Sequence, residues 1–411
     1  MRANNQESSL SSFLKYARNI AFISLISVID LPFLIKKGVS KGDKTLLIIK
    51  TDGIGDYVLF RNFLGAVRTS DRFKDFKITL LGDDKFKDMA EYFDGDYVDE
   101  FVWFDRSRFC NKLAYHYKNL INFRRKRVSV VLQANMSRNF MTDRIAKFIN
   151  AGEKIAHVGE PCYDTRRVFR KHSNRWYTNL VATTEGAFEF NRNKEFFEKI
   201  LGRTIPISRP SFDDARLRQI GFDFKKYAID GDFIVVTPGS GELWKNWSPD
   251  NFSEVCSFIL SMHKGMKVAI CGSTGDSEAA GRISLKLPAG STTDLCGKTS
   301  VCELAAILSR AKLLVSCDTG AVHLAAALGT PTVCVSSIGD RHFGRFIPYP
   351  KEVFDRQICI FHPIIESIVS NLPQDNKLFY TGPILNVNEI SWKTVVERIE
   401  KFQKANYHSY A

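Results

Sequence analysis

The residues with the clearest chemical potential lie in the stretch LLVSCDTGAVHLAAALGTPTVCVSS, Leu313 to Ser337. Its two apolar runs predict buried strands, and Asp318 and Thr319 are good N-cap residues for the short helix predicted between them. The free N–H groups and the dipole at such a helix start favour an anion by up to about 1 kcal/mol. We therefore expect a phosphate over Thr319 and Gly320, with His323 near the same opening. A capped helix with a satisfied histidine is the alternative.

A second junction between a strand and a turn carries a lysine. TPGSGELWKNWSPDNF follows the predicted strand DFIVVTP, with Gly239 and Ser240 in the turn and Lys245 just after it. A lysine held between a glycine turn and a helix start is suited to neutralising a departing diphosphate. Taken alone, Lys245 could equally be a surface charge without a role.

Two further turns are candidates for holding a nucleotide. In VAICGSTGDSEAAGRI, Gly272 forms the turn, and Asp276 is placed either to accept hydrogen bonds from ribose hydroxyls or to cap the next helix. The turn from Cys296 to Thr299, which contains Lys298, is a candidate for lining a base pocket.

A fourth loop, in the first half of the chain, offers a carboxylate. In TLLIIKTDGIGDYVLF a strand is followed by a turn with Gly53 and Gly55, and then by a helix that begins near Asp56. The turn lacks Gly-Lys-Ser/Thr, and Val58 stands where a GxGxxG motif has its last glycine, so it is neither a Walker loop nor a dinucleotide fingerprint. A carboxylate at this edge can act as a general base, worth about 10²- to 10⁴-fold. An N-cap aspartate without catalytic duty is the alternative for Asp56.

The strands of a sheet must position these loops, and the sequence pattern predicts two such sheets. From Thr45 onward, apolar runs alternate with helix-like segments, which is typical of α/β units around parallel sheets. The runs are TLLIIK, KITLLG, VSVVLQA, DFIVVTP, MKVAICG, KLLVSC and PTVCVSS. We expect two doubly wound sheets that face each other, with ligands at the C-terminal ends of their strands.

The chain divides into four predicted parts. Between Gly152 and Ile229 the strand pattern is lost, so the domain boundary is expected near Ser208 to Gly231. The parts are an N-terminal apolar and basic segment (1–40), a first Rossmann-like domain (41–225), a second Rossmann-like domain (226–385) and a C-terminal helix (386–411).

Composition fits a basic globular protein with a large core. The 411 residues are 44% hydrophobic, and 58 Lys and Arg against 45 Asp and Glu give a net charge of +13. Such a surface favours a nucleic acid, an anionic membrane or a negatively charged substrate. The densest basic run, Arg124 to Arg127, is either a solvated helix end or a phosphate or lipid contact. The nine cysteines show neither CxxC nor zinc spacing and suit a reducing cytoplasm.

The N-terminal segment has an unusual apolar run, Ile20 to Ile35, flanked by Lys and Arg. It is short for a span of about 20 residues and is broken by Asp30 and Pro32. No small-x-small cleavage site follows it, so a signal peptide is not expected. Three alternatives stay open: an interfacial helix on a membrane, a helix packed on the soluble fold, and a true span.

Taken together, these motifs resemble glycosyltransferase family 9, the heptosyltransferases of the bacterial lipopolysaccharide core and their relatives in surface-polysaccharide pathways. The similarity runs from about Leu46 to Ser337. GKTSVCELAAILSRAKLLVSCDTGAVHLAAALGTPTV is similar to the family's donor-domain signature, in which a histidine follows DTG. PGSGELWKNWSPDNF resembles its Pro-Gly loop with Lys-x-Trp, and LLIIKTDGIGDYVLF resembles its N-terminal strand and Leu-Gly-Asp turn.

The resemblance implies a GT-B fold, two Rossmann-like domains facing across a cleft, and inverting transfer without a metal or other cofactor. Asp56 is then the base and Lys245 neutralises the leaving phosphates. Residues 41–225 are then the acceptor-binding domain, with Gly53 and Gly55 in the acceptor-side loop, and residues 226–385 are the donor-binding domain. The donor site, for a nucleotide-sugar expected to be an ADP-heptose, would comprise Gly239, Ser240, Gly272, Asp276, Lys298, Asp318, Thr319, Gly320 and His323. The expected partners are this donor, a lipid-linked or phosphorylated glycan acceptor and the cytoplasmic face of an anionic inner membrane, with no nucleic acid.

Two departures from the family pattern leave the sugar open. Gly53 and Ile54 replace a more usual Ser-Leu, and Ser337 to Asp340 replaces a Gly-Pro turn. The following HFGRFIPYP, His342 to Pro350, resembles polysaccharide-type members, so transfer of another sugar in O-antigen or capsule synthesis is an alternative. The other rivals are a nucleotide-sugar epimerase, a non-catalytic membrane- or nucleic-acid-binding protein, and a metal-dependent GT-A enzyme using the DxD matches Asp94 to Asp96 or Asp230 to Asp232.

Overall fold

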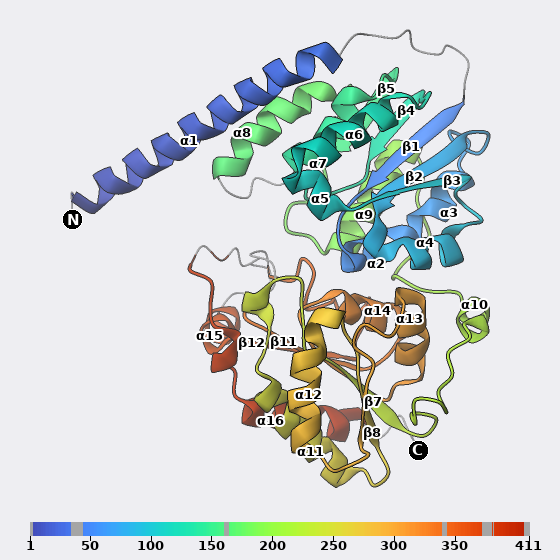
Figure 1. Cartoon of the computed structure of the whole chain (residues 1–411), viewed down its shortest axis with the longest axis vertical. Helices are drawn as coiled ribbons and strands as arrows, with labels where there is room; N and C mark the ends of the chain where they lie inside the picture. Colours follow the sequence, from blue (N-terminus) through green and yellow to red (C-terminus); the bar gives the residue numbers. More distant parts are fainter. Residues whose placement is uncertain are drawn as a thin grey trace.

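The computed structural model describes residues 3–33, 44–159, 164–338, 343–371, 380 and 382–406, without the side chains of residues 3–16, 33, 164–167, 403, 405 and 406. The sequence predictions for residues 34–40, 339–342 and 407–411 therefore lie outside the described residues. In the described part of the chain, two six-stranded sheets lie one above the other, each with helices packed around it (Figure 1).

The first sheet has the strand order β3-β2-β1-β4-β5-β6, and all of its pairs are parallel. Its strands are β1 (Thr45–Lys50), β2 (Lys77–Asp83), β3 (Glu100–Phe104), β4 (Val130–Gln133), β5 (Glu153–His157) and β6 (Asn179–Val181). Its helices are α2 (Ile54–Arg61), α3 (Phe63–Arg68), α4 (Lys87–Asp94), α5 (Arg106–Asn111), α6 (Leu113–Arg124), α7 (Phe140–Phe148), α8 (Asp164–Ser173) and α9 (Glu189–Leu201).

The second sheet has the order β12-β11-β10-β7-β8-β9 and is also parallel throughout. Its strands are β7 (Phe233–Thr237), β8 (Lys267–Ile270), β9 (Thr292–Asp294), β10 (Leu314–Cys317), β11 (Thr332–Ser336) and β12 (Gln357–Phe361). The helices that follow β6 and α9 are α10 (Asp214–Gln219), α11 (Pro249–Met262), α12 (Ser277–Lys286), α13 (Val301–Arg310), α14 (Gly320–Leu328), α15 (Pro363–Ser370) and α16 (Trp392–Asn406).

Both sheets follow the same doubly wound order. Counted from its own first strand, each reads 3-2-1-4-5-6, so the winding reverses between β1 and β4 in one sheet and between β7 and β10 in the other. Ligands of such sheets bind outside the carboxyl ends of the strands at this reversal point. The loops after β1, β4, β7 and β10 are therefore the ones that the fold offers to a ligand.

The predicted strands are present, but one prediction about them is wrong. The segment between Gly152 and Ile229, which we expected to lack strands, contains β5 and β6. Strand β5 has the sequence EKIAH and β6 has only three residues, so neither shows the continuous apolar run of a central strand. The boundary expected near Ser208 to Gly231 falls in the connection between α9 and β7.

The C-terminal helix α16 packs on α11 and β12, so it covers the second sheet (Figure 1). Its Val395 and Ile399, one turn apart, are buried with Trp247 in the core of that domain. The sequence left open which domain this helix would cover.

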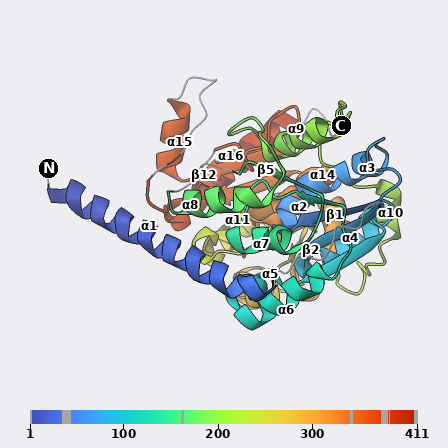
Figure 2. The same cartoon turned by 90° about the horizontal axis from the view of Figure 1, so that it is seen from above.

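The N-terminal helix α1 (Ala3–Asp30) lies beside α8 and extends beyond the first domain (Figures 1 and 2). Its inner face buries Ile23 and Ile26 and ends at Asp30, which is fully buried. Asp30 forms ion pairs with Arg144 and, at 2.6 Å, with Lys147 of α7. The aspartate that interrupts the apolar run is therefore the residue that anchors this helix. Among the described residues, no helix is long and apolar enough to cross a bilayer.

The two domains meet most closely where helices α2 and α14 begin. A Cβ atom added to Gly55 would lie 2.4 Å from Cδ2 of His323, and one added to Gly320 would lie 3.0 Å from Cβ of Ile54. Real Cβ atoms are essentially not found below 3.0 Å from a neighbour, so a Cβ at position 55 would have to displace the His323 ring, and one at position 320 would stand at this limit. The two helix starts therefore approach each other closely because these positions lack side chains.

This contact predicts the sign of a substitution. In an unobstructed helix, an alanine in place of glycine stabilises a protein by about 0.5–1 kcal/mol. At position 55 the clash with the buried His323 ring should win, so Gly55→Ala should lower the free energy of unfolding by about 1–3 kcal/mol in a urea titration.

Gly53→Ala is the matched control, because the nearest atom to its added Cβ would be Oδ2 of Asp56, at 3.6 Å. Its φ of −80° suits any residue, so its midpoint should stay near that of the wild type. A Gly55→Ala protein as stable as the wild type would show that the two helix starts are not packed as described.

Candidate functional site

The loops at the two reversal points enclose one cavity of about 1060 Å³ between the sheets. The first domain contributes Gly53, Ile54, Gly55, Asp56, Lys85, Arg106 and Ser137 to its wall. The second contributes, among others, Gly239, Ser240, Lys245, Gly272, Asp276, Asp318, Thr319, Gly320 and His323. With the exception of Lys298, the residues predicted from the sequence all line this one cavity.

Asp56 lies on the first-domain wall of the cavity. Helix α2 begins at Ile54, two residues earlier than expected, so Asp56 stands at the third helical position rather than at the N-cap. Its carboxylate accepts a hydrogen bond from the Gly53 N–H at 3.3 Å. Burial, followed by the nearby negative charge of Asp52, raises the pKa of Asp56 to about 7, against the opposing effect of Lys50. This carboxylate can therefore both hold and release a proton near neutral pH.

Buried polar contacts at the ends of β1 and β4 hold the loop that carries Asp56. The Lys50 ammonium, fully buried, donates to the Asp52 carboxylate at 2.9 Å and lies 3.4 Å from the Ala134 carbonyl oxygen. Thr51 and Asn135 exchange two hydrogen bonds, of 3.0 and 2.7 Å, between the ends of β1 and β4. These contacts close the reversal point of the first sheet and leave the loop little freedom to move.

The second-domain wall holds Lys245 and Asp318 together. Lys245 ends the short 3-10 turn η4 (Leu243–Lys245), and its ammonium donates to Asp318 at 3.0 Å. The neighbouring Trp247 is buried, and its indole N–H donates to the Ile390 carbonyl at 2.9 Å. The loop after β7 is thus anchored by tryptophan, and the loop after β10 supplies the carboxylate that orients the lysine.

The start of helix α14 faces the same cavity. Thr319 is its N-cap residue but makes no side-chain hydrogen bond to the helix start, so the sequence-based expectation of a side-chain cap by Thr319 is wrong. Thr319, Gly320 and Ala321 all line the cavity. A helix start without a side-chain cap leaves its first N–H groups for a ligand, and the dipole favours an anion there.

His323 lies one turn into α14, buried against the first domain. Its Nδ1 and the Tyr349 hydroxyl are 2.8 Å apart. Burial is the main cause that lowers the pKa of His323 to about 4, so the imidazole is neutral at pH 7. The histidine is therefore both satisfied by a neighbour and part of the cavity wall, beside Gly55.

Asp276 closes a turn and faces the cavity at the same time. It accepts hydrogen bonds from the Ser273 N–H at 2.7 Å and the Ser273 hydroxyl at 2.8 Å, around the 3-10 turn η5 (Thr274–Asp276). A Cβ added to Gly239 would lie 1.7 Å from its Oδ1, and one added to Gly272 would lie 2.7 Å from its Oδ2. Both glycines are required by the position of this carboxylate.

Lys298 does not line the cavity. Its ammonium donates to the Asp294 carbonyl oxygen at 2.7 Å, and about half of its side chain is exposed. The neighbouring Thr299 and Ser300 line the cavity instead. We therefore leave Lys298 out of the site, since its side chain already caps the turn after β9.

Several lining residues were missed by the sequence analysis. Lys85 and Arg106 follow β2 and β3, and Ser137 follows β4, so the rule that ligands bind after parallel strands could have found them. Arg345 and Phe346 come from the HFGRFIPYP segment, whose pattern was noticed but not assigned a role. The DxD match at Asp94 lies elsewhere: its carboxylate is buried and paired with Arg61 at 2.8 Å.

The curated relatives are lipopolysaccharide heptosyltransferases. Lipopolysaccharide heptosyltransferase 3 of Escherichia coli K12 is 30% identical over 119 residues, 28% of this chain and 34% of the relative. Lipopolysaccharide core heptosyltransferase OpsX of Haemophilus influenzae is 27% identical over 194 residues, 46% of this chain and 50% of the relative. The chain thus spans about a third to a half of the length of these relatives.

Solved structures share the fold. A family 9 glycosyl transferase from Veillonella parvula superposes with a TM-score of 0.63 at 18% identity, covering 90% of this chain and all of the other. The E. coli ADP-heptose lps heptosyltransferase II gives 0.62 at 15% identity, over 88% and 99% of the two chains. The two facing Rossmann-like sheets are therefore a GT-B fold. The model of glycosyltransferase family 9 (heptosyltransferase) matches residues 131–353, more than half of the chain, and this protein belongs to that family.

Proposed function

We propose that this protein is an inverting, metal-independent glycosyltransferase that moves a sugar from a nucleotide-sugar to a lipopolysaccharide core or a related surface glycan. The observation that carries the proposal is the arrangement of the cavity. A carboxylate with a raised pKa, Asp56, lies on one wall, and an ammonium and an uncapped helix start lie on the other. A base and an anion site that face each other are what a single displacement at a sugar phosphate needs.

The proposed step uses each group once. Asp56 takes the proton of the acceptor hydroxyl, whose oxygen then forms a bond to the anomeric carbon of the donor. The bond from that carbon to the diphosphate oxygen breaks, and the diphosphate leaves with the electron pair. Lys245 and the N–H groups at the start of α14 stabilise the charge on the departing diphosphate. One displacement of this kind inverts the anomeric carbon, and it asks for no metal ion.

The proposed donor is an ADP-linked heptose. Two solved neighbours, the E. coli heptosyltransferase WaaC with ADP and with ADP-2-deoxy-2-fluoro heptose, share the fold with TM-scores of 0.61. Family membership and the curated heptosyltransferase relatives support the same sugar for this chain. Another sugar of O-antigen or capsule synthesis is the alternative, favoured by the HFGRFIPYP segment.

The proposed acceptor carries negative charge. Lys85 and Arg106 line the first-domain side of the cavity, away from the lysine that serves the donor, and Lys85 is exposed. Cations at that wall suit a phosphorylated glycan, because they would hold its anionic groups while the hydroxyl reaches Asp56.

The acceptor's lipid is proposed to lie in the cytoplasmic face of the inner membrane, with helix α1 against the bilayer. Ile20, Leu25 and Val28 on the outer face of α1, and Leu31 just after it, are between 41% and 65% exposed. Arg18, Lys171 and Arg175 are exposed on α1 and on the neighbouring segment. An apolar helix face flanked by cations binds anionic lipid surfaces.

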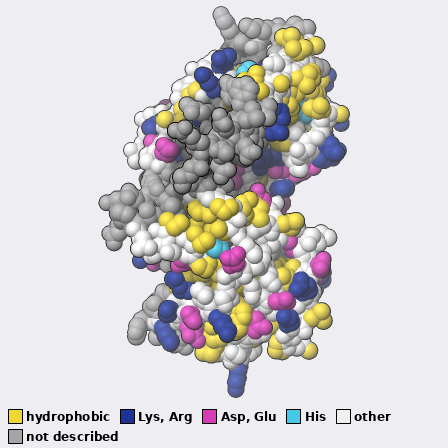
Figure 3. All heavy atoms as spheres, turned by 90° about the vertical axis from the view of Figure 1, so that its left-hand side faces the viewer, with side chains coloured by type: hydrophobic (Ala, Val, Ile, Leu, Met, Phe, Trp, Pro, Cys, Tyr) yellow, Lys and Arg dark blue, Asp and Glu magenta, His cyan; other side chains and the backbone are white. Residues whose placement is uncertain are grey.

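Figure 3 views the side from which α1 projects, with α15 below it. Hydrophobic side chains gather on the lower domain just below the waist of the molecule (Figure 3). Ile364 of α15 and Ile384, which lines the cavity, are 49% and 61% exposed in that domain. These apolar groups extend the proposed lipid-facing side towards the mouth of the cavity.

The catalytic proposal is tested by transfer from ADP-heptose to a lipopolysaccharide acceptor with EDTA present. Asp56→Asn should reduce kcat by at least about 10²-fold, because the amide cannot take the proton, while ADP still binds. Asp71→Asn, which changes an exposed carboxylate, is the control and should behave like the wild type. Turnover of the donor without acceptor would favour an epimerase, and near-normal turnover by Asp56→Asn would remove Asp56 from the mechanism.

The pH profile gives an independent prediction. Asp56 works deprotonated and its pKa is raised to about 7, so kcat/KM should fall as the pH drops through about 7. An aspartate with an ordinary pKa would keep the profile flat down to about pH 4. A flat profile between pH 5 and 8 would contradict the assignment of Asp56 as the base.

Membrane contact is tested by co-sedimentation with vesicles of phosphatidylethanolamine and phosphatidylglycerol. The wild type should bind, and the double variant Leu25→Glu, Val28→Glu should lose most of the binding, because it places charge on the apolar face. Leu285→Glu on α12 is the matched control, since this leucine is 87% exposed but lies in the other domain. Equal binding of all three proteins would exclude α1 as the contact.

A further inference from the structure

The segment between β11 and β12 crosses from the second domain to the first. Arg345 in this segment is buried, with 1% of its side chain exposed. Its Nε donates to Oε2 of Glu189 at 3.0 Å, and its Nη2 donates to the Ser137 hydroxyl at 2.6 Å. In return, the Glu189 N–H donates to the Arg345 carbonyl oxygen at 2.7 Å. Three hydrogen bonds thus dock one residue of the donor-side domain onto the other domain.

Glu189, the carboxylate on which Arg345 docks, is buried between two arginines. Glu189 begins α9, and Arg192, one turn later, donates to it at 2.9 Å. Burial alone would raise the pKa of Glu189, but Arg345 and Arg192 outweigh it and hold this pKa at about 2. Glu189 therefore stays ionised over the whole range in which the protein works, and the pair is not interrupted by protonation.

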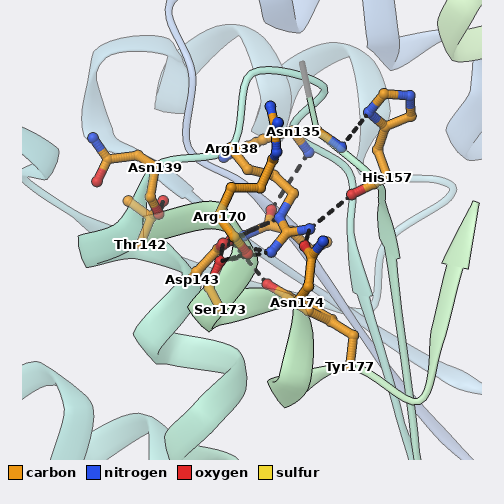
Figure 4. Close-up of polar contacts among 12 residues, drawn as sticks. Asn135, Arg138, Asn139, Thr142, Asp143, His157, Arg170, Ser173, Asn174 and Tyr177 are labelled. Atoms are coloured by element: carbon orange, nitrogen blue, oxygen red, sulfur yellow. Dashed lines mark hydrogen bonds and ion pairs between the residues drawn. The ribbon is translucent and has the colours of Figure 1, made fainter. Parts of the chain in front are cut away.

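The second docking partner, Ser137, lies on a loop that a polar network holds in place (Figure 4). The next residue, Arg138, donates to the Asp143 carboxylate at 2.7 Å, to the His157 carbonyl oxygen at 2.8 Å and to the Asn174 side chain at 2.7 Å. This network ties the end of β4 to α7, β5 and the turn after α8 (Figure 4). Arg345 therefore docks on a loop that is held by contacts within the first domain.

The same segment also touches the donor-side helix. Tyr349, four residues after Arg345, pairs with His323 of α14 and packs on Phe188, with ring centroids 4.7 Å apart. Phe188 immediately precedes Glu189. The segment therefore lies between α14, which is proposed to hold the donor phosphates, and α9 of the acceptor-side domain.

We propose that Arg345 is a positioning residue of the transfer site, which docks the donor-side domain on Glu189 and Ser137 and so holds Asp56 opposite the start of α14. This inference rests on the proposed function for its kinetic consequences, but the docking itself does not. Arg345 and Ser137 also line the cavity, so this docking contact lies in the same cavity as the reacting groups.

The charges around Asp56 make the role testable. Asp52 and Lys50 face it from the end of β1, Glu189 from α9 and Arg345 from the crossing segment, and the neutral His323 lies beside Gly55. Glu189 raises the pKa of Asp56 and Arg345 lowers it. Removing either charge undocks the same contact, but the two removals move the pKa of Asp56 in opposite directions.

The experiment compares Arg345→Gln and Glu189→Gln in the transfer assay across pH. Both should lose between about 10-fold and 100-fold in kcat, because the two halves of the site are no longer held in line. The acidic limb of kcat/KM should move to higher pH in Arg345→Gln and to lower pH in Glu189→Gln. Arg345→Lys should restore part of kcat, and the affinity for ADP should stay within about twofold in all three, since these variants leave Lys245 and the start of α14 unchanged.

Arg398→Gln on α16 is the control, because this arginine is 45% exposed and pairs with Glu366 away from the cavity. Wild-type kcat with unmoved limbs in both variants, or limbs that move the same way, would overturn the proposal. If Arg345→Gln fails to fold, Arg345→Lys and Ser137→Ala decide, and unchanged kcat in both would overturn it as well.

Small-angle scattering separates this proposal from the proposed function. Arg345→Gln should have a larger radius of gyration than the wild type, whether or not the wild type transfers sugar. A wild type without transferase activity would contradict the proposed function but not the docking role of Arg345. A radius of gyration and a kcat of Arg345→Gln that both equal those of the wild type would contradict the positioning role but not the proposed function.

Discussion

The site depends on the close contact between the starts of helices α2 and α14, where both helices have a glycine and no Cβ atom lies between them. Gly55 begins the close approach from α2, and Gly320 completes it from α14. Because each helix starts directly after the strand at its sheet's reversal point, their contact brings both ligand-binding edges to one cavity. The same contact buries His323 beside Gly55, and the residue that follows Gly55 in the sequence is Asp56. A side chain at Gly55 would have to displace the buried His323 ring, and one at Gly320 would crowd Ile54.

Burial sets the protonation states in this cavity. It raises the pKa of Asp56 to about 7 and lowers that of His323 to about 4, so the carboxyl can exchange a proton at neutral pH while the imidazole stays neutral. The charged groups around these two residues form ion pairs: Lys50 with Asp52, Lys245 with Asp318, and Arg345 with Glu189. In the cavity, Asp56 can therefore exchange a proton near neutral pH, while the charged groups around it are held in ion pairs.

The sequence predicted the parts of the fold that have local signals. Continuous apolar runs such as TLLIIK and FIVVT mark central parallel strands, whereas EKIAH of β5, the strand beside the edge strand β6, begins with two charged residues and shows no such run. The glycine loops after β1, β7 and β10 could be assigned to one site, since parallel strands deliver their ends to one edge. Arg345 could not be assigned, because its partner Glu189 is 156 residues away and only the packed domains bring them together. Lys298 was misplaced because a turn lysine looks the same whether it faces a ligand or its own backbone.

Calorimetric titration with ADP in the presence of EDTA tests the central claim most directly, that Lys245 and the start of α14 form a metal-free phosphate site. The account predicts that ADP binds the wild type and binds Lys245→Met about 10- to 100-fold more weakly, because a charged hydrogen bond to the diphosphate is lost and Asp318 is left unpaired. Equal affinity of the two proteins, or binding that appears only when a divalent metal is added, would contradict it.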